Sequence, residues 1–484
     1  MAIDRQAAAV AGFAALVLLV ISLYVSSPSP APATGAAGQA VLAYANGNVI
    51  NAYYGNATDY GWERSINYTV HQYDYNTNHT YFLNETLGAV NMSIVIGGAD
   101  YATPTLYRNL LLVPTMGNVT DLVDSRYDLS RGTLVEVDIN TGKKVWVDTF
   151  PDQLMGQPII AGNEVVVAMG NNQEVPGQYK NYAAGLFGIN ITSGVVVWHY
   201  DTPMNPDMAT PGYWNGMVIE PTDAGEVNIL NATTGALVWK LAVGLPDVLS
   251  SPMVIDGIAY FGAGYFGSNN GTIGRSTKRF FNFTAVGIAN GTALWSRNFP
   301  YAGSGLNDEC PVWYDGMVIT GYLYNSSYDN PVVVALNATS GGTVWAVNET
   351  QYLDANTPRA GRPLRLGWNY TQNSMSPLVL WHGSVFADSN FVGEMFSINA
   401  STGRVNWVFD TGQNEAAPNI VGGYLVTVND AGTMFVLNAT TGALVGSQDT
   451  GLHHLGNQPV VTRNFIILGT MDGKVVSFSV NSVI

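Results

Sequence analysis

The sequence predicts an all-β fold: an eight-bladed β-propeller of four-stranded antiparallel blades, preceded by one N-terminal transmembrane or signal helix. Three observations carry this prediction: a turn motif that recurs along the chain, a proline that opens an apolar segment eight times, and an apolar stretch at the N-terminus. Repeats of about 40 to 50 residues are typical of propellers, in which each repeat forms one blade.

The recurring turn has the form Asn-x-Thr-Thr/Ser-Gly and leads into an apolar strand that ends in tryptophan, as in NATTGALVW. Its glycine provides the left-handed backbone position that a tight hairpin needs. We expect each tryptophan to be mostly buried between neighbouring blades. Six copies of the motif end in Trp146, Trp198, Trp239, Trp295, Trp345 and Trp407, and a seventh copy ends at Gly446.

The recurring proline gives the number of blades. Proline is tolerated at the first residue of a strand, where no ladder donor is lost. Close to its C-terminus the chain reads KVVSFSVN, which resembles a third strand, so the last blade lacks its outer strand. We expect residues 58–66, around Trp62, to supply this strand and close the ring, because closure removes exposed sheet edges. The eight prolines are Pro104, Pro158, Pro211, Pro252, Pro311, Pro377, Pro418 and Pro459.

The N-terminal segment predicts where the protein resides. Residues 7–25 contain no charge and are long enough to cross the hydrocarbon core of a membrane. Arg5 favours a cytoplasmic amino terminus, with the rest of the chain outside. We therefore divide the chain into a transmembrane anchor or signal segment at 1–25, a Pro/Ala/Ser-rich linker at 26–40 and the propeller at 41–484. The protein is then held at the cell membrane, or secreted if the segment is cleaved.

Composition excludes several classes of function. The 484 residues carry a formal net charge of −16, and only 11% of them are charged. With so few cations, binding to nucleic acid is not expected, because that binding depends on Lys and Arg that neutralise phosphates. The single cysteine, Cys310, excludes an intrachain disulfide and a four-cysteine zinc site.

Asn-x-Ser/Thr sequons are unusually dense. Seventeen are present, about three times the number expected by chance. An Asn- and Thr-rich surface also makes sequons by accident, which is the alternative explanation. Together with the low charge and the anchor, the sequons indicate a glycosylated archaeal cell-surface protein. Five of them occupy the recurring turn, at Asn190, Asn231, Asn337, Asn399 and Asn438.

Strand order assigns every loop to one of two faces. The turns between third and fourth strands lie on what we call the turn face, and we call the opposite face the funnel face. The N-terminal strand enters at the turn face, so we expect that face to point towards the membrane. The funnel face is left for ligands or partners, since long loops on a rigid scaffold are usually the functional ones. The long funnel-face insertions are residues 67–100, 117–131, 170–184, 265–281 and 350–373.

Asp308 and Glu309 are the candidate catalytic residues. They precede Cys310 and the inner-strand proline of one blade, which places them at the central mouth. Carboxyl groups crowded in a partly dry funnel have raised pKa values, as general-acid catalysis requires. The alternative is that both residues cap a turn and that Cys310 is a small buried apolar residue.

Cationic residues concentrate in two of the funnel-face insertions. Arginine is suited to bidentate contacts with oxyanions, so these residues predict an anion- or partner-binding site. Local charge balance is the alternative. The pair His453–His454 adds one side chain that could face the funnel, but we expect no metal site, because acidic or cysteine ligands at fixed spacing are missing. The cations are Arg275, Lys278, Arg279, Arg359, Arg362 and Arg365.

The turn motifs resemble the repeats of the PQQ-like, or quinoprotein-type, β-propeller superfamily over about residues 100–484. The resemblance implies a propeller fold, commonly with eight blades, and extends to secreted tetrathionate hydrolases and to quinoprotein alcohol dehydrogenases. The dehydrogenases hold PQQ beneath an adjacent cysteine pair, which one cysteine cannot provide. We therefore expect no cofactor.

Three functions remain open after these observations. The first is a binding or scaffold module that presents its funnel face to an envelope protein or to a second copy of itself. The second, implied by the resemblance to tetrathionate hydrolases, is an acid-active hydrolase of an inorganic polysulfur anion. In it Asp308 or Glu309 would protonate the substrate, and the arginines at 359, 362 and 365 would hold its sulfonates. The third is a quinoprotein dehydrogenase.

Overall fold

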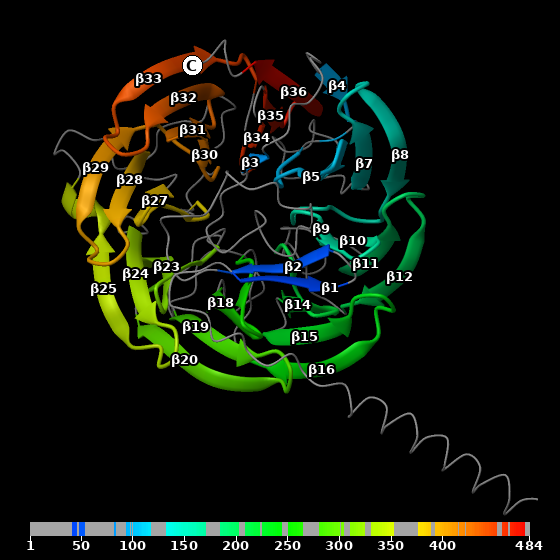
Figure 1. The fold of residues 1–484 in the computed structure, drawn as a ribbon, viewed down its shortest axis with the longest axis horizontal. Helices are drawn as coiled ribbons and strands as arrows, with labels where there is room; N and C mark the ends of the chain where they lie inside the picture. Colours follow the sequence, from blue (N-terminus) through cyan, green and yellow to red (C-terminus); the bar gives the residue numbers. More distant parts are fainter. Residues whose placement is uncertain are drawn as a thin grey trace, which may run out of the picture. The chain divides into compact units, whose positions relative to one another are not determined.

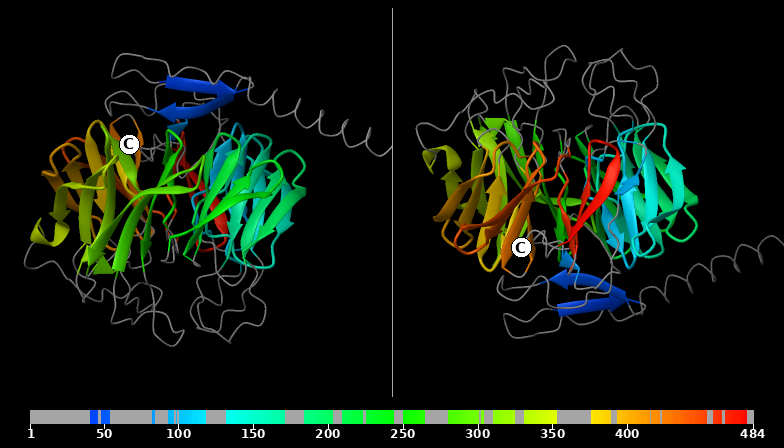
Figure 2. Two further views of the ribbon diagram at one scale, coloured as in Figure 1. Left: turned by 90° about the horizontal axis from the view of Figure 1, so that it is seen from below. Right: turned by 90° about the horizontal axis from the view of Figure 1, so that it is seen from above.

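Eight four-stranded antiparallel blades surround a central axis, as the sequence predicts (Figure 1). The computed structural model describes residues 41–45, 48–53, 82–83 and 93–479, with gaps inside the last range of which the longest are 118–131, 171–183, 265–279 and 353–375. Seen edge-on, the blade strands run between the two faces of the ring (Figure 2).

Within a blade, the strands follow one another from the axis outwards. The first four blades are β5 Thr105–Tyr107, β6 Leu110–Pro114, β7 Thr133–Asp138 and β8 Lys143–Thr149; β9 Ile159–Ala161, β10 Glu164–Met169, β11 Gly185–Asn190 and β12 Val196–Asp201; β13 Gly212–Trp214, β14 Met217–Thr222, β15 Glu226–Asn231 and β16 Leu237–Ala242; and β17 Met253–Ile255, β18 Ile258–Gly264, β19 Phe280–Gly287 and β20 Thr292–Pro300.

The remaining blades repeat this order, and the last one is completed from the N-terminal side. They are β22 Val312–Tyr314, β23 Met317–Tyr324, β24 Pro331–Asn337 and β25 Thr343–Asn348, with β21 Ala302–Gly303 beside β23; β26 Val379–Trp381, β27 Ser384–Asp388, β28 Glu394–Asn399 and β29 Val405–Asp410; β30 Asn419–Val421, β31 Tyr424–Val428, β32 Thr433–Asn438 and β33 Leu444–Asp449; and β34 Val460–Thr462, β35 Phe465–Gly469, β36 Lys474–Ser479 and β4 Ser93–Val95.

The predicted closing strand is wrong in position. β36 pairs with β4, with Val475 opposite Ile94, so the outer strand of the last blade lies at residues 93–95. Residues 58–66 lie outside the described residues. The segment NMSIVIGG that contains β4 carries neither the repeat turn nor a tryptophan, and therefore lacked the markers used to recognise outer strands. Residues 67–100 are consequently not one insertion, because they include β4 and β3.

The N-terminal segment also reaches the inner side of the same blade. β3 (Phe82–Leu83) pairs in parallel with the inner strand β34. The last blade is thus held between two strands from the beginning of the described chain, β3 on its inner edge and β4 on its outer edge. A separate hairpin of β1 (Val41–Ala45) and β2 (Asn48–Tyr53) precedes them.

The predicted tryptophans join neighbouring blades. The indole Nε1 of Trp198 donates a hydrogen bond of 2.8 Å to the carbonyl of Ala232, and its ring covers Gly235, where an added Cβ would lie 2.6 Å from the ring. The other five repeat tryptophans make the same two contacts with the next blade. Only Trp198 is fully buried, because the outer strand of each blade meets solvent on one side.

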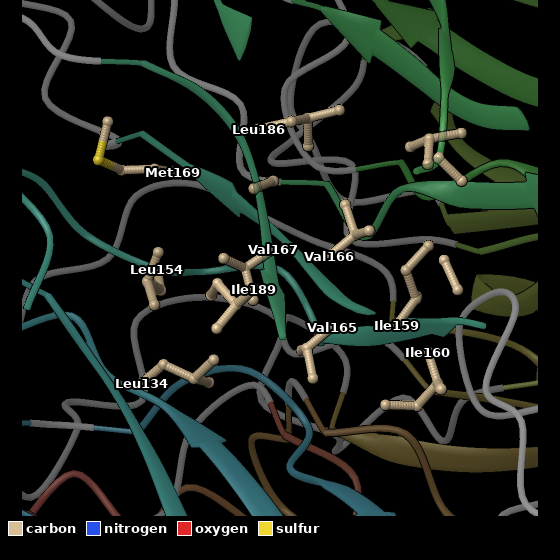
Figure 3. Close-up of a cluster of buried hydrophobic side chains, with 14 of the residues drawn as sticks. Leu134, Leu154, Ile159, Ile160, Val165, Val166, Val167, Met169, Leu186 and Ile189 are labelled. Carbon is tan, nitrogen blue, oxygen red and sulfur yellow. The ribbon is translucent and has the colours of Figure 1, made fainter. Parts of the chain in front are cut away.

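Apolar side chains fill the spaces between blades. In one such cluster Leu134 of β7 lies with Ile159, Val165 and Leu186 of the next blade (Figure 3). At the inner mouth, hydroxyl groups connect successive blades: the amide of Gln157 donates to Thr210 Oγ1 at 2.8 Å, and the amide of Thr210 donates to Ser251 Oγ at 2.9 Å. These contacts fix the inner ends of the funnel-face loops.

None of the described helices is both long and apolar enough for a membrane span. The expected helix at residues 7–25 lies outside the described part of the chain. The described 3-10 helix relevant to the site is η3, Glu349–Tyr352, which follows β25 directly.

Candidate functional site

The charged residues predicted from the sequence lie outside the described residues, so their roles stay predictions. They are Asp308, Glu309, Arg275, Lys278, Arg279, Arg359, Arg362, Arg365, His453 and His454. Their neighbour Cys310 is described and is 2% exposed, immediately before Pro311 and β22. Cys310 therefore packs as a small buried residue at the start of an inner strand.

Two carboxyl groups that sequence reasoning missed lie between the fifth and sixth blades. Glu349 begins η3 at the funnel-face end of the outer strand β25, and Glu394 is the first residue of β28. Glu349 has no exposed surface, and Glu394 is 6% exposed. Because Phe396 and Ile398 of β28 pack against the fifth blade, Glu394 shares the strand face that meets that blade.

The surroundings of Glu349 favour its neutral form. Burial, and to a smaller extent the nearby charge of Glu394, raise the pKa of Glu349 to about 8. Neither carboxyl oxygen of Glu349 has a hydrogen-bond partner among the described residues. A buried carboxyl group without a partner keeps its proton at neutral and acidic pH, so Glu349 is a potential proton donor at the funnel-face end of the blades.

A third carboxyl group, Asp388, occupies the opposite side of the sixth blade. Its Oδ2 accepts a hydrogen bond of 3.0 Å from Thr411 Oγ1 and one of 3.1 Å from Asn414 Nδ2. Asn414 also donates to Thr427 Oγ1 of the seventh blade at 2.8 Å. The funnel-face end of this blade thus carries a carboxyl group without a described partner on one side and a hydrogen-bonded carboxyl group on the other.

A fourth buried carboxyl group lies where the ring closes. Asp100, in the connection from β4 to β5, is completely buried, and neither of its side-chain oxygens has a hydrogen-bond partner among the described residues. Burial raises its pKa well above the usual value. Its carboxyl group lies directly over Gly469, where a side chain would collide with it. Over the described ranges, His, Cys, Asp and Glu side chains nowhere gather in threes as metal ligands.

Comparison with known proteins shows that the sequence of this chain matches a repeat family. A profile of the family described as outer membrane protein assembly factor BamB matches residues 119–264, 223–364 and 329–482. Tetrathionate hydrolase of Acidithiobacillus ferrooxidans is 27% identical over 233 residues, which cover 44% of this chain and 44% of that protein. BamB of Moranella endobia is 24% identical over 270 residues, covering 52% of this chain and 58% of that protein.

A solved structure gives the same fold. Quinohemoprotein alcohol dehydrogenase from Comamonas testosteroni superposes with a TM-score of 0.58 at 12% identity, over 85% of this chain and 80% of that one. The chain spans less than two thirds of the length of the curated relatives given above. These similarities carry the fold and the repeat, while the chemistry depends on the residues of this chain.

Proposed function

This chain belongs to the PQQ-like repeat family of the outer membrane protein assembly factor BamB, and from that premise we propose that its funnel face carries out acid-dependent hydrolysis of a polythionate. The observation that carries the proposal is the buried Glu349, whose carboxyl oxygens have no partner among the described residues and whose pKa is raised to about 8. The similarity to tetrathionate hydrolase supports the substrate class.

Glu349 acts as general acid in this proposal. Water attacks a terminal sulfonate sulfur, the bond from that sulfur to the sulfane chain breaks, and Glu349 protonates the departing sulfur. The attacked end leaves as sulfate, the remaining disulfane sulfonate divides into thiosulfate and elemental sulfur, and the protons of the attacking water pass to the solvent. The segment that follows η3 carries Arg359, Arg362 and Arg365, whose guanidinium groups bind the terminal sulfonates. Asp308 and Glu309 are the competing acids, because the same chemistry requires only one protonated carboxyl group.

The test is turnover of tetrathionate by the full chain between pH 2 and 5, followed by release of thiosulfate and sulfate. Glu349→Gln should reduce kcat at least about a hundredfold, as loss of a general acid does. Glu226→Gln is the matched control, since Glu226 pairs with Lys240 on a blade surface, and it should keep full activity. If Asp308→Asn or Glu309→Gln abolishes turnover and Glu349→Gln does not, the acid is misassigned. Absence of turnover by the parent chain at every pH contradicts hydrolysis itself.

The second candidate is a binding or scaffold module. The family match to an assembly factor favours it, as does the complete burial of Glu349, which is also compatible with a structural role. In this case the funnel face docks an envelope protein or a second copy of the chain. Cross-linking in native membranes should then capture the partner with the parent chain and fail to capture it after charge reversal at Arg359 and Arg362. The hydrolase proposal predicts instead that the same substitutions abolish substrate binding.

Location and modification complete the proposal. An archaeal cell surface, with residues 7–25 as the membrane anchor, agrees with the low charge and the dense sequons. The turn asparagines Asn190, Asn231, Asn337, Asn399 and Asn438 are exposed or half-exposed at one end of their blades, which supports them as N-glycan acceptors. Glycopeptide mapping of native protein should find sugar on several of them. Unmodified asparagine at all five contradicts the glycan ring.

A further inference from the structure

The side chains of the five turn asparagines cap the turn backbone. At Asn231, Oδ1 accepts a hydrogen bond of 3.0 Å from the amide of Thr233 and another of 3.0 Å from that of Thr234. Asn438 makes the same pair of contacts two and three residues ahead, both at 3.0 Å. Asn190, Asn337 and Asn399 repeat it. The side-chain oxygen therefore accepts from two turn amides. In the Asn399 and Asn438 turns the second of these amides also makes a longer contact with the backbone carbonyl of the same asparagine, at 3.3 and 3.2 Å.

The first blade shows that a carboxylate fits the same place. Asp138 accepts hydrogen bonds from the amides of Asn140 at 2.8 Å and Thr141 at 3.2 Å. Asparagine and aspartate are therefore equivalent caps in geometry. They differ in titration, because an ordinary aspartate takes up a proton near pH 4 and its oxygens then accept hydrogen bonds less well. An amide oxygen keeps its acceptor strength at any pH.

A separate observation, on buried carboxyl groups, also favours an acidic medium. Asp100 and Glu349 are completely buried, and their carboxyl oxygens meet no hydrogen-bond donor among the described residues. Such a group is accommodated at low cost only while protonated. At neutral pH, ionisation would leave a buried negative charge without a partner. The two buried acids and the asparagine caps therefore both favour low pH, although they lie in different parts of the propeller.

We propose that the propeller is built to stay folded in an acidic medium, with uncharged amide caps that hold its turns at a pH where carboxylate caps fail. An acidic medium is also the one in which the proposed hydrolysis would run. Acid stability is a property of the fold, however, and does not depend on whether the protein turns over tetrathionate.

Other titratable groups lie on the strands packed against these turns. β12, whose Trp198 covers the Asn231 turn, carries His199 and Asp201; β29, whose Trp407 covers the Asn438 turn, carries Asp410 and follows Arg404. Lys143 and Lys144 begin the strand after Asp138. All of them are present in parent and variant alike, so a comparison between variants at one pH isolates the cap.

The test compares unfolding by denaturant at pH 7 and pH 2 for the full chain from a host without N-glycosylation. Asn231→Asp with Asn438→Asp should match the parent at pH 7 and lower the folding equilibrium constant about tenfold at pH 2, as expected when two caps weaken. Replacing both asparagines by alanine, which removes the cap altogether, should cost stability at both pH values.

Two results would overturn the proposal. One is an aspartate double variant that is as stable as the parent at pH 2. Sugar attachment would then explain why asparagine rather than aspartate occupies these turns. The other is an equal loss at pH 2 and pH 7, which would show a steric effect of the substitution rather than protonation. Neither result depends on tetrathionate turnover, so failure of the hydrolase proposal leaves this test intact.

Discussion

A tryptophan and a glycine from neighbouring blades form the contact that recurs most regularly in this protein. Trp345, for example, covers Gly403 and donates a 2.9 Å hydrogen bond to the carbonyl of Ala400. Both residues belong to the local repeat, which is why the sequence predicted that the tryptophan packs between blades. It did not predict that the ring covers the turn glycine of the next blade. The burial of Glu349 could not be predicted in the same way, because it arises from a different blade brought alongside by the ring, and no local pattern encodes that neighbour.

Replacement of Trp345 by alanine should lower the free energy of unfolding by about 3 kcal/mol, since it removes the ring from Gly403 and leaves the carbonyl of Ala400 without its donor. Denaturant unfolding at constant pH measures the loss. Trp345→Phe is the control, because it keeps an aromatic ring and loses only the hydrogen bond, so it should cost much less. Equal stability of the parent and the alanine variant would contradict the role of the ring.

At the scale of elements, the eight prolines predicted the inner strands well: seven of them immediately precede an inner strand, and Pro377 lies two residues before β26. The outer strand of the last blade was predicted in the wrong segment. Six of the seven other outer strands contain the repeat tryptophan, and this pattern placed the predicted closing strand around Trp62. β4 instead closes the ring with Ile94, whose side chain packs against the core cluster between the last and first blades.

A cysteine pair can test this closure directly. Val95 lies opposite Lys474 in the β4–β36 ladder, and facing residues of antiparallel strands have Cα separations of about 4.5 to 5.5 Å, within the range that a disulfide spans. Val95→Cys with Lys474→Cys should therefore cross-link on mild oxidation, as a mobility shift in non-reducing gels. Trp62→Cys with Lys474→Cys is the control and should stay open. Cross-linking of the control pair alone would restore the closing strand at residues 58–66.

At the scale of the whole molecule, stability should fall as the pH rises from acid to neutral and beyond. The pKa of Glu349 is about 8 in the folded protein, above the usual value of 4.5, and that of Asp100 is raised in the same direction. The folded state therefore binds these protons more tightly than the unfolded chain. The stabilisation is fully present below about pH 4 and is lost as the pH rises through the folded pKa values.

For Glu349 alone, the loss between pH 4 and pH 8 should be about 3 to 5 kcal/mol. Unfolding free energies at pH 5 and pH 8 measure it, and Glu349→Gln should flatten the dependence because glutamine does not titrate. A parent chain that is more stable at pH 8 than at pH 5 would show that these carboxyl groups acquire partners on ionisation.

The composition of the last blade also sets the order in which its strands are synthesised and can pair. β3 and β4 are made early by the ribosome, yet the strands they pair with, β34 and β36, are among the last to appear. Two of the five strands of this sheet are therefore present in the growing chain long before the other three. Until the C-terminal residues are released, the first blade has an uncovered flank, at which the unfinished chain can associate with a neighbouring copy.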